Sequence, residues 1–187
     1  MNSRHVLLGC ALAAGIFVST IHGAKQTALD RYVAQRLARP AAALQDEPDA
    51  RAAVERFLRA LAALYADPRN PGGCFIVTGA SDLGGTAVPA AVDQQLRGAL
   101  QANEGLLHAR LQRAVEQGQL EPGTNVERLA AYFMSIVAGL GVLARAGARR
   151  SRLDGVVAAA MQAWPGATPP PIPPTRPSRS RVRASTR

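Results

Sequence analysis

Lysine is almost absent from this sequence, because Lys25 is the only one in 187 residues. Cysteine is also scarce: Cys10 and Cys74 are the only two, which excludes the disulfide framework of small secreted domains. Aromatic residues make up only 4% of the chain, while 48% is apolar and dominated by alanine and leucine. Because alanine and leucine lose little rotamer freedom in a helix, we expect an all-α fold with a single main core.

Groups that could carry out catalysis are also missing. The three histidines, His5, His22 and His108, have no metal-ligand spacing with one another or with either cysteine. No Gly-x-Ser-x-Gly nucleophile elbow is present. We therefore expect a protein that is not an enzyme, with no metal site and no cofactor.

One segment imitates a nucleotide-binding enzyme. Residues 74–85, CFIVTGASDLGG, resemble the strand and glycine-rich turn that open short-chain dehydrogenases. The second glycine of that motif would fall on Leu83, and the chain before residue 70 has a helical pattern rather than a strand. That family also needs a Tyr-x-x-x-Lys pair further along the chain, which is impossible because Lys25 precedes the segment. We therefore exclude nicotinamide chemistry.

The positive charge is unevenly distributed. The formal net charge is +9, but residues 165–187 contain five arginines and no acid, which leaves only +4 for residues 1–164. The same segment contains a run of prolines, which favours neither helices nor sheets, so we expect a disordered tail. The high net charge therefore does not by itself indicate a surface that reads nucleic acid.

The middle of the chain has the apolar spacing of amphipathic helices. Apolar residues recur at helical intervals over 54–65, 89–117, 125–146 and 151–164. The second helix would be about 40 Å long at 1.5 Å per residue. Gly98 and Gly105 lie within it, where we expect a bend or a break.

The helix over 125–146 has more apolar surface than one core contact needs. It carries two apolar stripes, and the helix after it adds a third. We therefore expect these two helices to form an interface between two copies of the chain rather than to be buried within one subunit. The candidate interface residues are Leu129, Phe133, Ile136, Val137, Leu140, Val156, Val157 and Met161. Charges placed at Ile136 or Leu140 should break such a dimer.

Three stretches of the sequence stand out: 28–32, 67–77, and 114–120 with the helix over 125–143 and the residues 146–148. In this order they resemble the C-terminal regulatory domain of TetR/AcrR-type transcriptional repressors. The first is ALDRY at 28–32, similar to the start of the helix that leaves the DNA-binding head. The second is DPRNPGGCFIV at 67–77, similar to the family's entry to a mid-domain helix. The third comprises AVEQGQL at 114–120, the helix over 125–143 and AGA at 146–148, similar to a long helix, a turn and the dimerisation helices.

The resemblance implies an orthogonal multi-helix bundle over residues 28–164, preceded by an apolar segment at 1–27 and followed by the tail at 165–187. It also implies a cytoplasmic homodimer in which a small hydrophobic effector enters a pocket among the middle helices and releases operator DNA. The helix faces that would line such a pocket supply the candidates Phe57, Leu61, Tyr65, Cys74, Phe75, Leu100 and His108. Tyr65 and His108 are the polar groups that we expect to orient the effector.

The DNA-binding head is the part that departs from the family. Residues 15–26 resemble a shortened recognition helix, in which Ser19, Thr20, His22 and Lys25 would face DNA. A helix-turn-helix needs two helices to support the third, and the 28 residues before Leu29 are too few for them. We therefore expect this chain to bind operator DNA poorly or not at all.

Two alternatives remain open on the sequence. Val6–Ile21 is an uncharged run of 16 residues after Arg4, so residues 1–24 can also be interpreted as an export signal or membrane anchor. Cys74 follows two glycines where a helix could begin, and a helix N-terminus lowers the pKa of a thiol. A thiol-based sensor of oxidants or electrophiles is the second alternative.

Overall fold

The computed structural model describes residue 29 and residues 31–70, 72–80, 83 and 89–166. Every element in these residues is helical, which confirms the all-α prediction. The elements are the π-helix η1 (Val33–Leu37), α2 (Ala38–Asp46), α3 (Ala50–Ala66), α4 (Phe75–Ala80), α5 (Ala90–Glu116), α6 (Val126–Arg145), α7 (Arg150–Ala160) and the 3-10 helix η2 (Met161–Ala163). The segments 1–27 and 167–187 lie outside the described residues.

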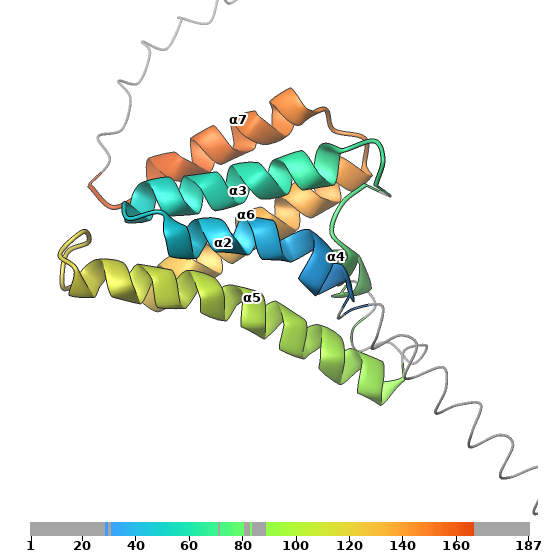
Figure 1. Ribbon diagram of the computed structural model, residues 1–187, viewed down its shortest axis with the longest axis horizontal. Coiled ribbons are helices and arrows are strands. Elements are labelled where there is room, and N and C mark those ends of the chain that lie inside the picture. Colours follow the sequence, from blue (N-terminus) through green and yellow to red (C-terminus); the bar gives the residue numbers. More distant parts are fainter. Residues whose placement is uncertain (1–28, 30, 71, 81–82, 84–88, 167–187) are drawn as a thin grey trace, which may run out of the picture.

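Helix α3 is the centre of the bundle. It packs against α2, α6 and α7, and α5 runs along the far side of α2 and α6 (Figure 1). The apolar stripe expected over 54–65 forms its buried face: Val54, Leu58 and Leu61 are each at most 1% exposed. Asp49 caps the helix by accepting a hydrogen bond from the Ala52 amide at 2.7 Å. This stripe therefore anchors the core.

Helix α5 differs from the expectation. It is continuous over 27 residues and passes through Gly98 and Gly105 without a break. Neither glycine has another group within 4 Å of where a Cβ would lie, so neither serves a close contact. The segment that imitates a dehydrogenase strand is helical as well, because α4 occupies Phe75–Ala80.

The helix that begins the domain changes its winding next to Pro40. Proline has no backbone N–H, so the Arg36 carbonyl cannot receive the usual α-helical hydrogen bond. The chain immediately before Pro40 is wound as the π-helix η1, and it continues into α2. π-turns of this kind occur most often at functional sites, and η1 borders the cavities described below.

The far end of α2 is held by side chains from α5. Arg110 donates hydrogen bonds to the carbonyls of Glu47 and Pro48 at 3.2 and 2.9 Å, and Arg113 donates to the Leu44 carbonyl at 2.8 Å. Arg110 is only 2% exposed, and burial, followed by the charge of Arg113, lowers its pKa. This end of α2 is therefore fixed, whereas the other end, which follows η1, borders the cavities described below.

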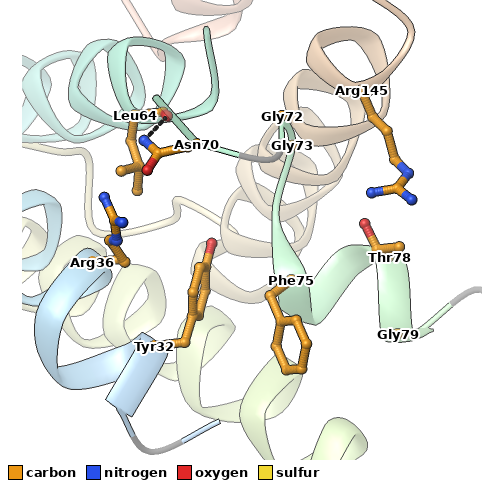
Figure 2. Close-up of a pocket in the computed structure, with 10 residues that line it drawn as sticks. All are labelled: Tyr32, Arg36, Leu64, Asn70, Gly72, Gly73, Phe75, Thr78, Gly79 and Arg145. Carbon is orange, nitrogen blue, oxygen red and sulfur yellow. Dashed lines mark hydrogen bonds between the residues drawn. The ribbon is translucent and has the colours of Figure 1, made fainter. Parts of the chain in front are cut away.

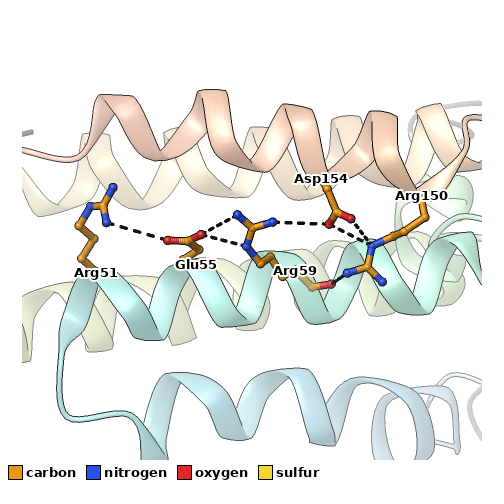
Figure 3. A network of polar contacts seen from close by, with 5 residues as sticks. All are labelled: Arg51, Glu55, Arg59, Arg150 and Asp154. Carbon is orange, nitrogen blue, oxygen red and sulfur yellow. Dashed lines mark hydrogen bonds and ion pairs between the residues drawn. The ribbon is translucent and has the colours of Figure 1, made fainter. Parts of the chain in front are cut away.

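Helices α3 and α7 are joined by a chain of ion pairs at the surface (Figure 3). Glu55 lies between Arg51 and Arg59, and Asp154 lies between Arg59 and Arg150. The Arg59–Glu55 and Arg150–Asp154 contacts are short, at 2.7 and 2.9 Å. Because these side chains are largely accessible to water, each pair contributes at most about 1 kcal/mol and orients the two helices rather than holding the fold together.

Candidate ligand-binding cavity

The main candidate site is a cavity of about 350 Å³ between η1, α4 and the end of α6. Figure 2 shows its wall, to which η1, the end of α3, the loop before α4, α4 itself and the last residue of α6 each contribute. A volume above about 300 Å³ is in the range of small-molecule sites. The lining residues are Tyr32, Arg36, Leu64, Asn70, Gly72, Gly73, Phe75, Thr78, Gly79 and Arg145.

Two glycines shape the back of this cavity. Gly72 and Gly73 have φ angles of +38° and +79°, which residues with a side chain rarely adopt. A Cβ on Gly73 would lie 2.7 Å from the Gly141 carbonyl oxygen, so the loop can approach α6 only as glycine. Gly141 on α6 is also closely packed, because a Cβ on it would lie 3.3 Å from the Cβ of Cys74. The loop and α6 therefore meet backbone to backbone.

Asn70 fixes the other end of this loop. Its side-chain amide donates to the Leu64 carbonyl at 3.2 Å, near the end of α3. The Gly72 amide in turn donates to the Asn70 carbonyl at 2.8 Å, and the Gly73 amide to the Tyr65 carbonyl at 3.4 Å. These bonds hold the loop in a fixed shape between α3 and α4.

The aromatic part of the lining is Tyr32 and Phe75. Their ring centroids are 5.7 Å apart with planes tilted by 47°, and Leu64 completes the apolar wall. Phe75 is 50% exposed, which is unusual for a phenylalanine. An apolar molecule in the cavity would find an aromatic surface already accessible.

Cys74 is buried behind the cavity wall and is only 3% exposed. The Tyr32 hydroxyl donates a hydrogen bond to its Sγ at 3.6 Å. Burial, followed by the proximity of Cys74, raises the pKa of Tyr32 and also that of Tyr65, so both tyrosines stay protonated at neutral pH. The thiol therefore lies between two neutral hydroxyl groups.

A smaller cavity of about 170 Å³ lies on another side of η1. Three of the predicted pocket residues, Phe57, Leu61 and Tyr65, line this cavity rather than the larger one. Because Tyr32 lines the larger cavity and Tyr65 the smaller one, Cys74 contacts the lining of both. The core behind η1 thus has free space on two sides.

The other predicted pocket residues are more scattered. Phe75 lines the larger cavity, but Leu100 and His108 line neither cavity. His108 is exposed on α5, one residue after the fully buried Leu107, so it cannot orient a molecule in either space. The lining residues that were not predicted from the sequence include Tyr32, Arg36, Asn70, Thr78 and Arg145. The resemblance at 28–32 was the available signal for Tyr32, and the resemblance at 67–77 was the available signal for Asn70.

The predicted interface residues divide into two groups. Phe133, Val137, Leu140, Val157 and Met161 are at most 3% exposed within the single subunit, so they cannot add contact area between subunits. The structure therefore corrects that part of the prediction, and a charge at Leu140 would unfold the subunit rather than separate a dimer. Leu129, Ile136 and Val156 remain partly accessible.

These three residues belong to a shared outward face of α6 and α7. On α6, Leu129, Tyr132, Ile136, Gly139 and Leu143 alternate at spacings of three and four residues, and none is fully buried. The matching positions after α6 are Arg152, Val156 and Ala159 on α7 and Ala163 on η2. We call these nine residues the α6–α7 face. A groove lined partly by Leu129, Tyr132 and Ala163 lies at one end of it.

Helix α6 is also long and apolar enough to cross a membrane, with a mean hydropathy of 1.5. The core helix of a soluble protein meets the same criterion. Here the apolar residues serve two sides, the core and the α6–α7 face.

The residues predicted to face DNA (Ser19, Thr20, His22 and Lys25) and the run at 6–21 lie outside the described part of the chain.

Comparison with known proteins identifies the domain. Residues 50–161 match the family described as the tetracyclin repressor-like C-terminal domain. The chain is 26% identical to the HTH-type transcriptional repressor ComR of Escherichia coli K12 over 144 residues, which are 76% of this chain and 68% of ComR.

Solved structures agree with this assignment. A cysteine-substituted TetR family regulator CifR, in complex with 26-bp operator DNA, has a TM-score of 0.70 and 31% identity over 75% of this chain and 72% of its own. A TetR regulator from Rhodococcus sp. RHA1 has a TM-score of 0.58 and 30% identity over 73% and 71%. The chain therefore belongs to the TetR family of transcriptional regulators.

Proposed function

We propose that this chain is the subunit of a repressor that senses a small hydrophobic effector in the larger cavity. The observation that carries the proposal is the cavity itself, which has the volume of a small-molecule site, an accessible aromatic wall and a lining shared by η1, α4 and α6. An effector bound there would contact both η1 and the glycine loop, and so would bias their relative positions.

The arrangement of the bundle supports a signal toward the N-terminal side. The far end of α2 is held by Arg110 and Arg113, whereas η1 lies between two cavities. An effector that pushes on η1 from the cavity would therefore move η1 relative to the end of α2 that Arg110 and Arg113 hold. CifR binds 26-bp operator DNA, and we propose operator DNA as the target of this regulator as well. How strongly this chain binds it depends on residues 15–26, which lie outside the described residues and for which the sequence predicts poor binding or none.

We further propose that the regulator acts as a homodimer through the α6–α7 face. Spacings of three and four residues along α6 are those of helices that pack side by side. The face is rich in small and apolar residues, and an isologous contact between two copies would cover it on both. Regulators of this family are generally cytoplasmic, and we propose the cytoplasm as the site of action.

Thiol chemistry at Cys74 fits the structure less well than effector binding. Its Sγ is almost fully buried and accepts the hydrogen bond from Tyr32. An oxidant or electrophile would have to displace this hydroxyl first, whereas a molecule in the cavity needs no such opening. Effector binding is therefore the function that we propose.

Filling the cavity tests the proposal. N-phenyl-1-naphthylamine is a neutral apolar dye that fluoresces when bound, and we expect the wild-type chain to bind it. Thr78 lines the cavity and is partly buried, so Thr78→Trp should weaken dye binding at least about tenfold by occupying the space. The measurement is a fluorescence titration.

Ala102→Trp is the matched control, because Ala102 is exposed on α5 and lines neither cavity. Its dye affinity should equal that of the wild type, and far-UV circular dichroism should show both variants folded. Equal affinity in Thr78→Trp and wild type would overturn the proposal.

A further inference from the structure

We propose that the larger cavity selects organic anions, that is, molecules with an apolar aromatic body and a carboxylate or sulfonate group, and that Arg145 receives the anionic group. This inference rests on the proposed function and specifies the chemical class of effector. The charge of the lining is the first argument: among the described residues that line the cavity, the ionisable groups are Tyr32, Arg36 and Arg145, and none of them is an acid.

Arg145 is the better placed of the two arginines. In Figure 2 its guanidinium points toward the Thr78 hydroxyl, on the opposite side of the lining from Arg36. Among the described residues it has no ion pair and no side-chain hydrogen bond. Arg36, by contrast, lines a neighbouring pocket together with Asp67. The hydrogen bonds from Arg69 are the main cause of the lowered pKa of that carboxyl, and the charge of Arg36 adds to it. Both guanidinium groups are exposed to water, and Arg145 is the one that has no charged partner among the described residues.

The end of α6 does not use the Arg145 side chain either. Arginine at a helix C-terminus often binds the free carbonyls of the last turn. Here the carbonyls of Val142, Leu143 and Ala144 already accept hydrogen bonds from the backbone amides of residues 146, 148 and 147, at 2.9–3.0 Å. The guanidinium therefore remains available to a ligand.

The rest of the lining matches the body of such a molecule. The rings of Tyr32 and Phe75 and the side chain of Leu64 offer an apolar surface in the same cavity, with Leu64 at the end opposite Arg145 (Figure 2). The Thr78 hydroxyl can donate a second hydrogen bond to the anionic group. A guanidinium beside an apolar wall favours a ligand that is charged at one end only.

Two dyes that differ in one group test this inference. 1-Anilinonaphthalene-8-sulfonate has the ring system of N-phenyl-1-naphthylamine plus a sulfonate. Arg145→Gln should raise the dissociation constant of the sulfonate dye at least about tenfold, as expected for loss of a charge-assisted hydrogen bond. The same variant should bind the neutral dye within about twofold of wild type, which also shows that it folds.

Arg149→Gln is the matched control, because it removes the same charge from an exposed position four residues along that lines neither cavity. It should leave the affinity for both dyes unchanged. An equal loss of sulfonate binding in Arg145→Gln and Arg149→Gln, or no loss in either, would overturn the anion preference while leaving the cavity proposal intact. Failure of the wild type to bind even the neutral dye would overturn both.

Discussion

Replacing Gly73 by alanine is expected to destabilise the domain by at least about 3 kcal/mol. Two costs add at this position. A φ of +79° costs a residue with a Cβ about 1–2 kcal/mol. The new Cβ would also lie 2.7 Å from the Gly141 carbonyl oxygen, which is backbone and cannot turn away. The loop would have to separate from α6, and the urea midpoint of unfolding measures the loss.

Gly118→Ala provides the control, because it separates the two costs. Gly118 has a φ of +69°, and no group lies within 4 Å of the place where its Cβ would be. Its replacement should cost only the conformational penalty of about 1–2 kcal/mol. Similar losses in the two variants would show that the contact between the loop and α6 is not as tight as described.

A glutamate at Ala159 is expected to convert a dimer of the chain into a monomer. Ala159 is exposed in the subunit and lies on the α6–α7 face near Val156. In an isologous interface each copy would bring one buried, unpaired carboxylate close to the symmetry-related one, which strongly opposes association. Sedimentation equilibrium should give twice 19.6 kDa for the wild type and 19.6 kDa for the variant.

Ala158→Glu is the control for this prediction. Ala158 is equally exposed on α7 but points about 100° around the helix from Ala159, away from the α6–α7 face. This variant should sediment as a dimer. A monomeric wild type, or two variants with the same mass, would contradict the proposed interface.

The sequence was sufficient to predict the helices but not how α6 divides its apolar surface. The 3.6-residue repeat predicted both the helices and an excess of apolar residues on α6. It placed both Leu129 and Phe133 at the expected interface, whereas in the structure Phe133 is fully buried and Leu129 lies on the outward face. The two faces lie next to each other around one helix, and the positions of α3, α5 and α7 decide which residues each face contains.

The cavity was harder to predict for a related reason. Arg145 and Tyr32 are 113 residues apart, and nothing in their local patterns indicates that they line the same space. His108 was chosen because it is a polar residue on an apolar-patterned helix, but the buried face of α5 contains Leu107 and Leu111, and His108 lies outside that face and is exposed. Phe75, by contrast, was identified because it lies on one of the helix faces expected to line the pocket.

Amide hydrogen exchange with and without saturating N-phenyl-1-naphthylamine tests the central claim, that occupation of the larger cavity is transmitted to η1. We predict slower exchange over residues 31–37 and 72–79, with unchanged exchange in the first half of α3, which is remote from the cavity lining. Unchanged exchange over residues 31–37 while the dye is bound would contradict the claim.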